Sequence, residues 1–589
     1  MKHFPGFAIF VAICLGLGVA SAQTVELGGH VSDAVESLNA SHLAPSAQTL
    51  HLSVILALRN QAALDKLLDD LHNPASPEYE HWLTPEQFNA RFGPAQDDFD
   101  EVVGWLKSEG FNVVSASLSD RTIRADGPVW MAERAFGAHI VASDDERAYG
   151  NLDNPVIPAR FAGVIGSIDG LDNLRHSMPL VQRSPKLSSA SQPPAPLTLA
   201  AYAPDSVPAQ DAGSEPNVKL GGGRAFGPAD LRTFYDENTV LNGGNNGNKQ
   251  GCFALIEDSN FLTSAVNLFN STFKLPAASI TRRFPTTNPG INGDETETLI
   301  DVEWGHVVAP GSALNVYIGN PSGKVDPLVE AISLAVKDNS CSVISISFGY
   351  CGASKSFFTV TLDPLFKKAA AQGQSVFVSS GDSGAADLVL DSGGNACVAG
   401  TSRNVNEMSA DPNVTSVGGT EFNPTYNSSG NDVSFVAEKV WNENTSQVQG
   451  AGGGGMSAIW AKPAYQSGKT PADKKRDVPD VSMIASPDLP GVWLGDDNGG
   501  AVMDCCWGGT SLAAPVFAGV VKLWNQKRGK RSGNINLGAS GLYASQLGLR
   551  DVKSGNNNFN GVTGFSAVAG YDRASGWGTA DIAKFLTRP

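Results

Sequence analysis

The most informative stretch of the sequence is Gly508-Gly509-Thr510-Ser511-Leu512-Ala513-Ala514-Pro515. It follows a turn-rich segment and opens an apolar run, residues 516–524, that is typical of a buried helix. Ser511 is therefore expected at or just before a helix N-terminus. Free backbone N–H groups and the positive end of the helix dipole favour negative charge at such a position. The stretch thus predicts either a nucleophilic serine or a serine that caps a structural helix.

Composition and the N-terminus limit the class of protein. The chain has 589 residues, enough for two or more domains, and its net charge of −17 argues against nucleic acid as a partner. Residues 1–22 combine Lys2 and His3 with a short apolar run and Ala20-Ser21-Ala22, a pattern typical of a cleaved signal peptide. This run is too short to span a bilayer and no later stretch qualifies, so we expect a protein exported to the exterior or the periplasm, without a membrane partner. We also expect it to be a monomer.

Residues 23–183 form a unit of their own, followed by a linker. Hydrophobic periodicity predicts alternating strands and helices in this unit, at residues 50–58, 61–72, 99–108, 111–118, 122–125 and 129–136. This βα-ββα pattern predicts an antiparallel α+β sandwich. Residues 184–215 are rich in Ser, Pro and Ala and are expected to form a flexible linker that contains a processing site.

The pattern changes in residues 216–589, where short apolar strands alternate with helices. The expected strands and helices are residues 253–257, 314–318, 327–337, 343–347, 362–372 and 375–379. This alternation predicts a doubly wound parallel sheet with helices on both faces. In such sheets a functional site lies beyond the carboxyl ends of the strands.

An acidic segment, residues 294–306, contains candidate bases for Ser511. In a helix, Glu297 and Asp301 are four residues apart and project from one face. The apolar residues between them indicate a helix packed on both sides, so both carboxyls are expected to be buried and one pKa must rise. His306 lies about 140° round the helix from Asp301, off that face.

Three other carboxylates in residues 216–589 are interpreted from the residues around them in the sequence. Glu295 and Glu303, in the same acidic segment, are expected on a solvated face. Asp382 stands in Ser379-Ser380-Gly381-Asp382-Ser383-Gly384, directly after the strand that ends near residue 379. Because this is the carboxyl end of a parallel strand, Asp382 is either a site residue or a turn residue.

Six cysteines remain once Cys14 leaves with the signal peptide, and six allow 15 connectivities. A strand between Cys341 and Cys351 argues against a bond between those two. Cys351–Cys397 is favoured because both flank loops. No histidine accompanies the cysteines, so they do not indicate a zinc site.

Together these positions resemble the sedolisin (serine-carboxyl peptidase) family. The segment around Ser511, the Glu-x-x-x-Asp helix of Glu297 and Asp301, and the Ser-Gly-Asp-x-Gly loop of Asp382 match the family's motifs in the family's order. Residues 80–88 resemble the prodomain of kumamolisin-like members. The resemblance implies a subtilisin-like doubly wound catalytic domain behind an α+β, ferredoxin-like prodomain that acts as an intramolecular inhibitor.

The resemblance also implies a mechanism on protein or peptide substrates. Ser511 attacks the peptide carbonyl, Glu297 takes its proton, and Asp301 shares a proton with Glu297 and orients it. A protonated Asp382 joins a backbone N–H in stabilising the oxyanion, which points to activity in acid. The chain departs from the family in one place, because Phe348 stands where kumamolisin-like members have a Trp behind the catalytic Glu. Glu257 matches the other residue of that hydrogen-bond chain.

Sedolisins bind Ca²⁺ at positions that match the C-terminal segment here. The implied ligands are two carboxylates and three backbone carbonyls, from Asp551, Val552, Val568, Gly570 and Asp572. Hard oxygen ligands of this kind suit calcium. The alternative is that the two aspartates occupy unrelated turns.

Three other functions compete with an acid-acting endopeptidase. A tripeptidyl-peptidase of the same family would use the same residues. A neutral subtilisin-type peptidase would need a histidine base, and His306 is the only one of nine histidines after the linker. A catalytically inactive secreted binding protein is disfavoured because Ser511, Glu297, Asp301 and Asp382 are all present.

Overall fold

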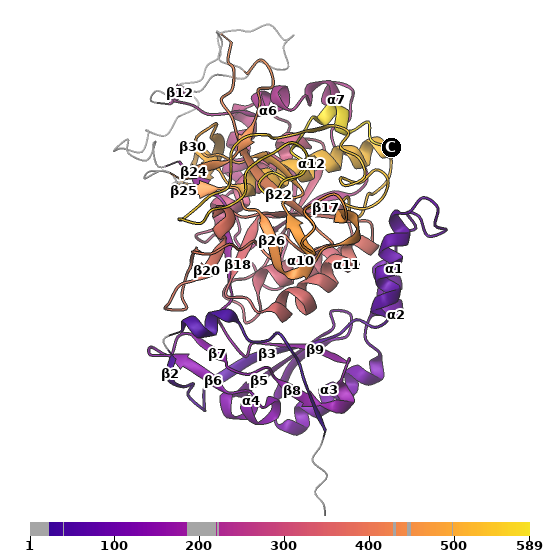
Figure 1. The fold of residues 1–589 in the computed structure, drawn as a ribbon, viewed down its shortest axis with the longest axis vertical. Helices are drawn as coiled ribbons and strands as arrows, with labels where there is room; N and C mark the ends of the chain where they lie inside the picture. The colour runs from indigo at the N-terminus through magenta and orange to yellow at the C-terminus, as the bar shows by residue number, and fades with distance from the viewer. Residues whose placement is uncertain are drawn as a thin grey trace, which may run out of the picture.

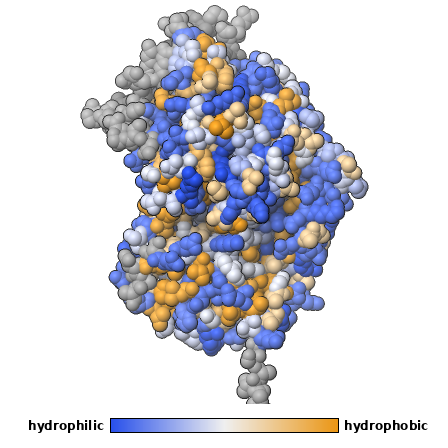
Figure 2. All heavy atoms as spheres, in the orientation of Figure 1, coloured by the Kyte–Doolittle hydropathy of each residue, from blue (hydrophilic) through white to orange (hydrophobic). Residues whose placement is uncertain are grey.

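The computed structural model describes residues 23–38, 40–184, 219–220, 223–427, 432–444, 449–497 and 499–589. The predicted signal peptide and nearly all of the predicted linker lie outside these residues. The chain forms an N-terminal domain, drawn in indigo to purple in Figure 1, and a larger C-terminal domain. No helix in the described residues is long and apolar enough to cross a membrane. On the face in Figure 2, polar and apolar side chains are mixed over both domains.

The N-terminal domain is built on a four-stranded antiparallel sheet. The strands lie in the order β4 (Asn112–Ser117), β5 (Thr122–Pro128), β3 (Thr49–Leu56) and β9 (Ile165–Asp169). Helices α3 (Gln96–Glu109) and α4 (Val129–Phe136) bury the apolar face of this sheet. Their order along the chain is βαββαβ, so the predicted ferredoxin-like α+β arrangement is confirmed.

Two further helices of this domain form an arm. Helix α1 (Gln61–His72) occupies the predicted residues, and α2 (Pro85–Phe92) follows it. Their apolar side chains pack on Ala370 and Ala371 of the C-terminal domain instead of on the N-terminal sheet. In Figure 1 the arm extends upward beside the C-terminal domain. The sequence predicted the helix but not this packing, because hydrophobic periodicity identifies a buried face without identifying its partner.

The C-terminal domain contains an eight-stranded sheet, of which seven strands are parallel. The order is β15-β16-β14-β17-β19-β22, with β28 pairing parallel and β23 antiparallel to β22. The strands are β14 (Cys252–Glu257), β15 (Ser279–Arg283), β16 (Ala313–Ile318), β17 (Cys341–Ile346), β19 (Ser375–Ser379), β22 (Thr415–Glu421), β23 (Lys439–Val440) and β28 (Val481–Ile484).

Helices cover both faces of this sheet, as predicted. Phe253 and Leu255 point into one core, with α8 (Thr263–Thr272), α9 (Glu295–Val308) and α12 (Thr510–Arg528). Ala254 and Ile256 point into the other core, with α10 (Pro327–Asp338) and α11 (Asp363–Ala371). Because both faces are buried, the strands appear in the sequence as continuous apolar runs.

Shorter elements complete the two domains. In the N-terminal domain they are β1 (Thr24–Glu26), η1 (Asp33–Ser37), β2 (Ala40–Leu43), β6 (Ile140–Ser143), β7 (Tyr149–Asn151), β8 (Val156–Pro158) and η2 (Ala159–Phe161). In the C-terminal domain they include α6 (Pro228–Phe234), α7 (Asn238–Asn242), β20 (Leu388–Leu390), β21 (Cys397–Ala399), β26 (Gly455–Ala461), β27 (Lys475–Val478), β29 (Val492–Asp497), β31 (Leu549–Arg550), β32 (Thr579–Ala580) and α13 (Ile582–Phe585).

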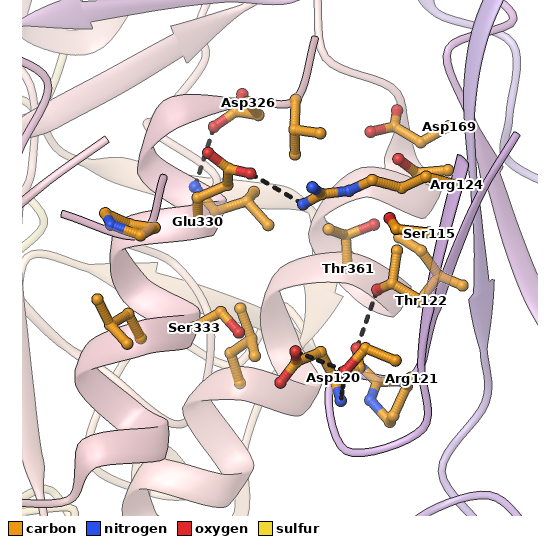
Figure 3. A pocket seen from close by; sticks show the side chains of 18 of the residues that line it. Ser115, Asp120, Arg121, Thr122, Arg124, Asp169, Asp326, Glu330, Ser333 and Thr361 are labelled. Carbon is orange, nitrogen blue, oxygen red and sulfur yellow. Dashed lines mark hydrogen bonds and ion pairs between the residues drawn. The ribbon is translucent and has the colours of Figure 1, made fainter. Parts of the chain in front are cut away.

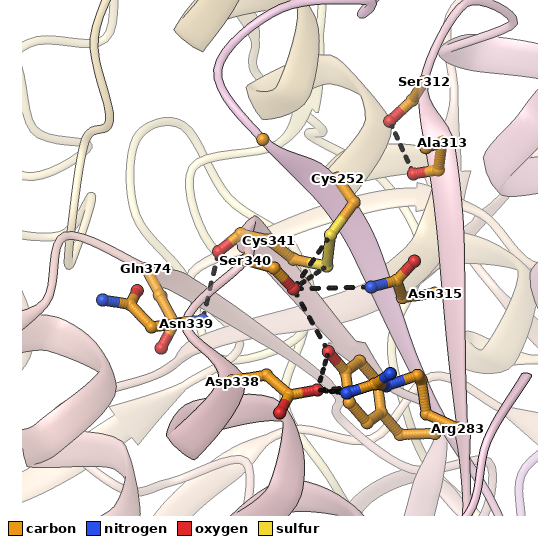
Figure 4. Close-up of a disulfide and its surroundings, with 12 residues drawn as sticks. Cys252, Arg283, Ser312, Ala313, Asn315, Asp338, Asn339, Ser340, Cys341 and Gln374 are labelled. Atoms are coloured by element: carbon orange, nitrogen blue, oxygen red, sulfur yellow. Dashed lines mark hydrogen bonds and ion pairs between the residues drawn. A yellow bond between two sulfur atoms is a disulfide. The ribbon is translucent and has the colours of Figure 1, made fainter. Parts of the chain in front are cut away.

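Three disulfides pair the six cysteines of the C-terminal domain. Cys351–Cys397 is the pair favoured by the sequence, and it is confirmed. Cys252–Cys341 joins the first residues of neighbouring strands β14 and β17 (Figure 4). The third joins the adjacent residues Cys505 and Cys506.

Candidate active site

Ser511 is the second residue of α12, at the position that the sequence predicted. Gly509 precedes the helix with a φ of 109°, a conformation that favours glycine. Ser511 is buried, and its Oγ donates a hydrogen bond to the carbonyl oxygen of Ser347 at 3.1 Å. Its backbone N–H lies in the first turn of α12 and so has no acceptor within the helix. This N–H is available to a ligand oxygen.

Glu297 and Asp301 lie on α9, which packs directly against α12. Both are fully buried. Burial raises the pKa of Glu297 well above its ordinary value, and the Asp301 charge raises it further, while the Ser511 side chain partly offsets the rise. Burial also raises the pKa of Asp301, although the Ser347 hydroxyl donates to its Oδ1 at 2.7 Å. The two carboxyls therefore compete for protons beside the serine.

Glu257 stands behind this pair, at the end of β14, and is fully buried as well. Burial, followed by the charges of Asp301 and Glu297, raises its pKa well above the ordinary value. Phe348 begins β18 (Phe348–Cys351) and is also buried. Because a phenyl ring cannot donate a hydrogen bond, Phe348 cannot extend a hydrogen-bond chain behind Glu297.

Asp382 lies in the loop after β19, next to Thr510, the residue that precedes Ser511. Its Oδ1 accepts hydrogen bonds from the backbone N–H of Thr510 at 2.8 Å and from the Thr510 hydroxyl at 2.7 Å. Its Oδ2 is buried and accepts no hydrogen bond of the usual geometry from the residues that the structure describes. Burial raises the pKa of Asp382 to about 7, with Thr510 and Gln182 partly opposing the rise. Protonated Asp382 would present an O–H donor at Oδ2.

His306 does not join this cluster. Its Nε2 is hydrogen-bonded to the carbonyl oxygen of Pro276 at 2.8 Å, and burial lowers its pKa. The expectation that Glu295 and Glu303 form a solvated face is wrong, since they are only 8% and 0% exposed. Glu295 accepts a hydrogen bond from the backbone N–H of Leu262, and Glu303 from that of Gly495. These partners lie outside the acidic segment, so the sequence pattern did not reveal them.

Residues 176–184, which we call the cleft segment, run past Ser511. Strand β10 (His176–Pro179) pairs antiparallel with β18, and the Leu180 N–H donates to the Ser347 carbonyl at 3.2 Å. Strand β11 (Gln182–Arg183) pairs antiparallel with β30 (Ala501–Gly508), the strand that leads into α12. No motif in the sequence marks this segment, so its pairing could not be predicted. Its role depends on the surfaces that it contacts.

Ion pairs join the N-terminal and C-terminal domains. In most of them an N-terminal carboxylate meets a C-terminal cation: Asp65–Lys367, Glu80–Arg528, Glu80–Lys530, Asp120–Lys337 and Asp126–Lys324. Arg124 and Glu330 form a pair of the opposite sense, at 2.9 Å (Figure 3). Asp326 accepts from Arg175 of the N-terminal domain at 3.1 Å. The contact between the domains is therefore strongly charged.

The predicted calcium ligands lie around one loop, residues 568–572. The N–H of Gly570 donates to Asp551 Oδ2 at 3.0 Å, and the N–H of Val568 donates to Asp572 Oδ2 at 2.9 Å. Both carboxylates are therefore held against the same loop. Among the described residues, no hydrogen bond is donated to the carbonyl oxygens of Val552, Val568 or Gly570. Two carboxylates and three free carbonyls fit a calcium ion.

Comparison with known proteins agrees with this architecture. Residues 37–174 match the family model "Pro-kumamolisin, activation domain". The chain is 28% identical to sedolisin of a Pseudomonas species over 93% of this chain and 89% of that protein. It is 29% identical to kumamolisin of a Bacillus species over 90% of each chain.

A solved structure shows the same relationship for the C-terminal domain. Pseudomonas sedolisin, a serine-carboxyl proteinase complexed with pseudo-iodotyrostatin, matches with a TM-score of 0.51 and 28% identity. The match covers 62% of this chain and 98% of that one. It assigns the subtilisin-like fold to the seven-stranded parallel sheet described above. The chain therefore belongs to the sedolisin family of serine-carboxyl peptidases, with a pro-kumamolisin-type activation domain preceding its peptidase domain.

Proposed function

We propose that this peptidase is a secreted, acid-acting endopeptidase that uses Ser511 as nucleophile, Glu297 and Asp301 as its proton-transfer pair, and Asp382 as oxyanion donor. The observation that carries the proposal is that hydrogen bonds link Ser511 to buried carboxyls on two elements: Ser347 is bonded to both Ser511 and Asp301, and Thr510, the neighbour of Ser511, is bonded to Asp382. Burial raises the pKa of all three carboxyls. The raised pKa keeps Asp382 neutral and able to donate in acid, and the close burial of Glu297 and Asp301 makes them share protons as a pair.

In the proposed reaction Ser511 Oγ attacks the carbonyl carbon of the substrate, and its proton passes to Glu297. Asp301 orients Glu297 and shares its proton. The negative charge on the carbonyl oxygen is stabilised by the Ser511 N–H and by the O–H of protonated Asp382. Glu297 then protonates the leaving amine. The roles are those of a serine triad with a carboxyl in place of histidine.

Endopeptidase activity is favoured over tripeptidyl-peptidase activity by the continuous chain that pairs with β18 and β30 beside Ser511. The cleft segment enters from residue 176 and leaves beyond residue 183, with strand pairing on both sides of Ser511. A tripeptidyl-peptidase must instead bind a free amino terminus three residues before the cut bond. A cleft that accommodates a continuous chain suits an internal peptide bond.

Peptidase activity should peak below pH 6, and the His306→Ala variant should retain both the activity and this pH optimum. The acid optimum follows from the neutral form that Asp382 needs in order to donate a hydrogen bond. His306 is hydrogen-bonded to the carbonyl oxygen of Pro276 and takes no part in the proposed reaction. The pH–activity profile of the variant on a peptide substrate should therefore match that of the wild type. A neutral optimum that disappears in His306→Ala would establish the histidine mechanism instead.

We further propose that the N-terminal domain inhibits the peptidase until acid weakens the contact between them. Burial alone raises the pKa of Glu80, but the hydrogen bond and charge of Lys530 and Arg528 outweigh burial, so its pKa is lowered. The pKa of Asp120 is lowered by the Ser117 hydroxyl and by Lys337, and that of Asp126 by His51 and Lys324, and these partners again outweigh burial. A lowered pKa means that these pairs stabilise the contact above the ordinary carboxyl pKa, about 4, and lose that effect as pH falls through the lowered value.

Calcium is proposed to tie the loop of residues 568–572 to Asp551. The carboxylates of Asp551 and Asp572 would hold the ion together with the carbonyls of Val552, Val568 and Gly570. The ion would supply charge that offsets two neighbouring carboxylates. It takes no part in the proposed reaction.

Removing calcium should therefore lower the melting temperature of the peptidase domain. Binding to the folded state alone adds about 2.7 kcal/mol at a hundredfold excess over Kd. The measurement is thermal unfolding with and without a chelator, and Asp551→Asn should be insensitive to the chelator. An unchanged melting temperature in protein shown to start calcium-loaded would disprove the site.

A further inference from the structure

We infer that the bond between Leu180 and Val181 is the first bond that Ser511 cuts, in its own chain. This inference rests on the proposed function and adds the identity of the first substrate. It places the first cut before the predicted linker of residues 184–215.

The strand pairings place this bond at the nucleophile. Residues of the cleft segment up to position 179 pair with β18, on one side of Ser511, and Leu180 continues that pairing through the Ser347 carbonyl. From Gln182 onward the segment pairs with β30, on the other side, with Gln182 opposite Gly508. The segment therefore passes from β18 to β30 between Leu180 and Gln182. Only two peptide bonds lie within this crossing.

The position of a carbonyl oxygen selects between them. A methyl group added to Gly509 would lie 2.0 Å from the Leu180 carbonyl oxygen and 2.8 Å from Asp382 Oδ2. The two oxygens thus lie close to one point beside Ser511, no further apart than the sum of these distances. The Leu180 carbonyl oxygen therefore lies near the carboxyl proposed as oxyanion donor, as the carbonyl of a bond about to be cut should.

The Ser347 carbonyl gives a second indication. It accepts both the Ser511 hydroxyl, at 3.1 Å, and the Leu180 N–H, at 3.2 Å. One backbone oxygen therefore links the nucleophile to the residue whose carbonyl it would attack. This arrangement holds the two reacting groups near each other before reaction.

The side chain of Leu180 is buried among apolar side chains. Leu180 is 2% exposed and belongs to a cluster that joins Leu388 and Leu390 of the C-terminal domain to apolar side chains of the N-terminal domain, among them Leu174. A methyl group on Gly349 would lie 3.4 Å from Leu388 Cδ1 and 3.7 Å from Leu180 Cδ2. Gly349 and Leu388 thus form walls of the pocket that would bind the residue before the cut bond. The enzyme should accept a leucine-sized apolar side chain there and disfavour a charged one.

The reaction at this bond needs only water as a second reactant. Ser511 Oγ bonds to the Leu180 carbonyl carbon, and the Leu180–Val181 C–N bond breaks while Glu297 delivers the proton to the Val181 nitrogen. Water then hydrolyses the ester and restores the Ser511 hydroxyl. The products are a carboxyl group on Leu180 and a free amine on Val181.

The test begins with purified precursor transferred from neutral to acid pH. Intact mass and N-terminal sequencing of the earliest products should give a new N-terminus at Val181 and an N-terminal fragment ending at Leu180. The fraction converted per unit time should not depend on protein concentration, because the bond is cut in its own chain. A first new N-terminus after residue 184, or a rate proportional to concentration, would overturn the inference.

Variants connect the cut to the pocket. Leu180→Asp should slow the first cut by at least about tenfold, since a hydrophobic pocket discriminates single groups by 10–200-fold. Leu180→Met should restore it, and Leu197→Asp in the linker should leave it unchanged. Equal rates for Leu180→Asp and Leu197→Asp would contradict the inference.

A peptide assay avoids any effect of these variants on folding. Mature enzyme should cut a synthetic peptide of residues 176–185 between Leu and Val, and a peptide with Asp in place of that Leu at least about tenfold more slowly. If the enzyme hydrolyses other peptides but cuts this one elsewhere, the inference fails and the proposed function stands. If wild-type enzyme hydrolyses no peptide at all, the proposed function fails.

Discussion

Glu297→Gln is expected to lower kcat by about 10⁴-fold or more while leaving the fold unchanged. The amide has nearly the volume of the carboxyl but cannot take the Ser511 proton, and loss of one member of a serine triad typically costs 10⁴–10⁶-fold. Steady-state hydrolysis of a peptide by the mature variant, matched to wild type in melting temperature, measures the effect.

The matched control is Glu303→Gln, on the same helix and equally buried. Glu303 accepts a hydrogen bond from the N–H of Gly495 at 2.9 Å, and a glutamine oxygen can accept it as well. This variant should therefore retain nearly full activity. Activity of Glu297→Gln within tenfold of Glu303→Gln would contradict the role of Glu297 as base.

The second large effect is expected at Asp382, where alanine should lower kcat by about 10²–10³-fold. Removal of one oxyanion donor typically costs this much. Burial raises the pKa of Asp382 to about 7, so the donor form is present below pH 7 and disappears as pH rises through that value.

Asp382→Asn should separate the donor from its titration. Thr510 donates two hydrogen bonds to Oδ1, so the asparagine oxygen should occupy that position and the amide N–H₂ should replace Oδ2. The variant should keep far more activity than Asp382→Ala. Its activity should also no longer decrease near pH 7, because an amide does not ionise as the Asp382 carboxyl does. A pH profile of kcat for both variants measures this. Equal losses in the two variants would argue against a donor role.

Sequence periodicity predicted the regular elements well. The helices of residues 61–72 and 129–136 have the predicted bounds, since apolar side chains recur with the helical period. The same reasoning placed Glu297 and Asp301 on one buried face, because local spacing alone determines that relationship.

Features set by distant partners could not be predicted in this way. The burial of Glu303 depends on the N–H of Gly495, 192 residues away in the chain. The cleft segment is defined by its pairing with β18 and β30, and it contains no motif of its own. Periodicity reports a local pattern, whereas these features depend on which surfaces meet after folding.

The arm of α1 and α2 gives the first cut a consequence for inhibition. Its packing on Ala370 and Ala371, and the Glu80 pairs with Arg528 and Lys530, are independent of the bond that is cut. Before cleavage, a covalent link holds inhibitor and enzyme at an effective concentration on the order of millimolar. After cleavage, the N-terminal domain is a separate molecule, and the fraction of peptidase that it occupies falls with dilution. Activity should then appear fully only where the two parts are free to diffuse apart, outside a crowded compartment.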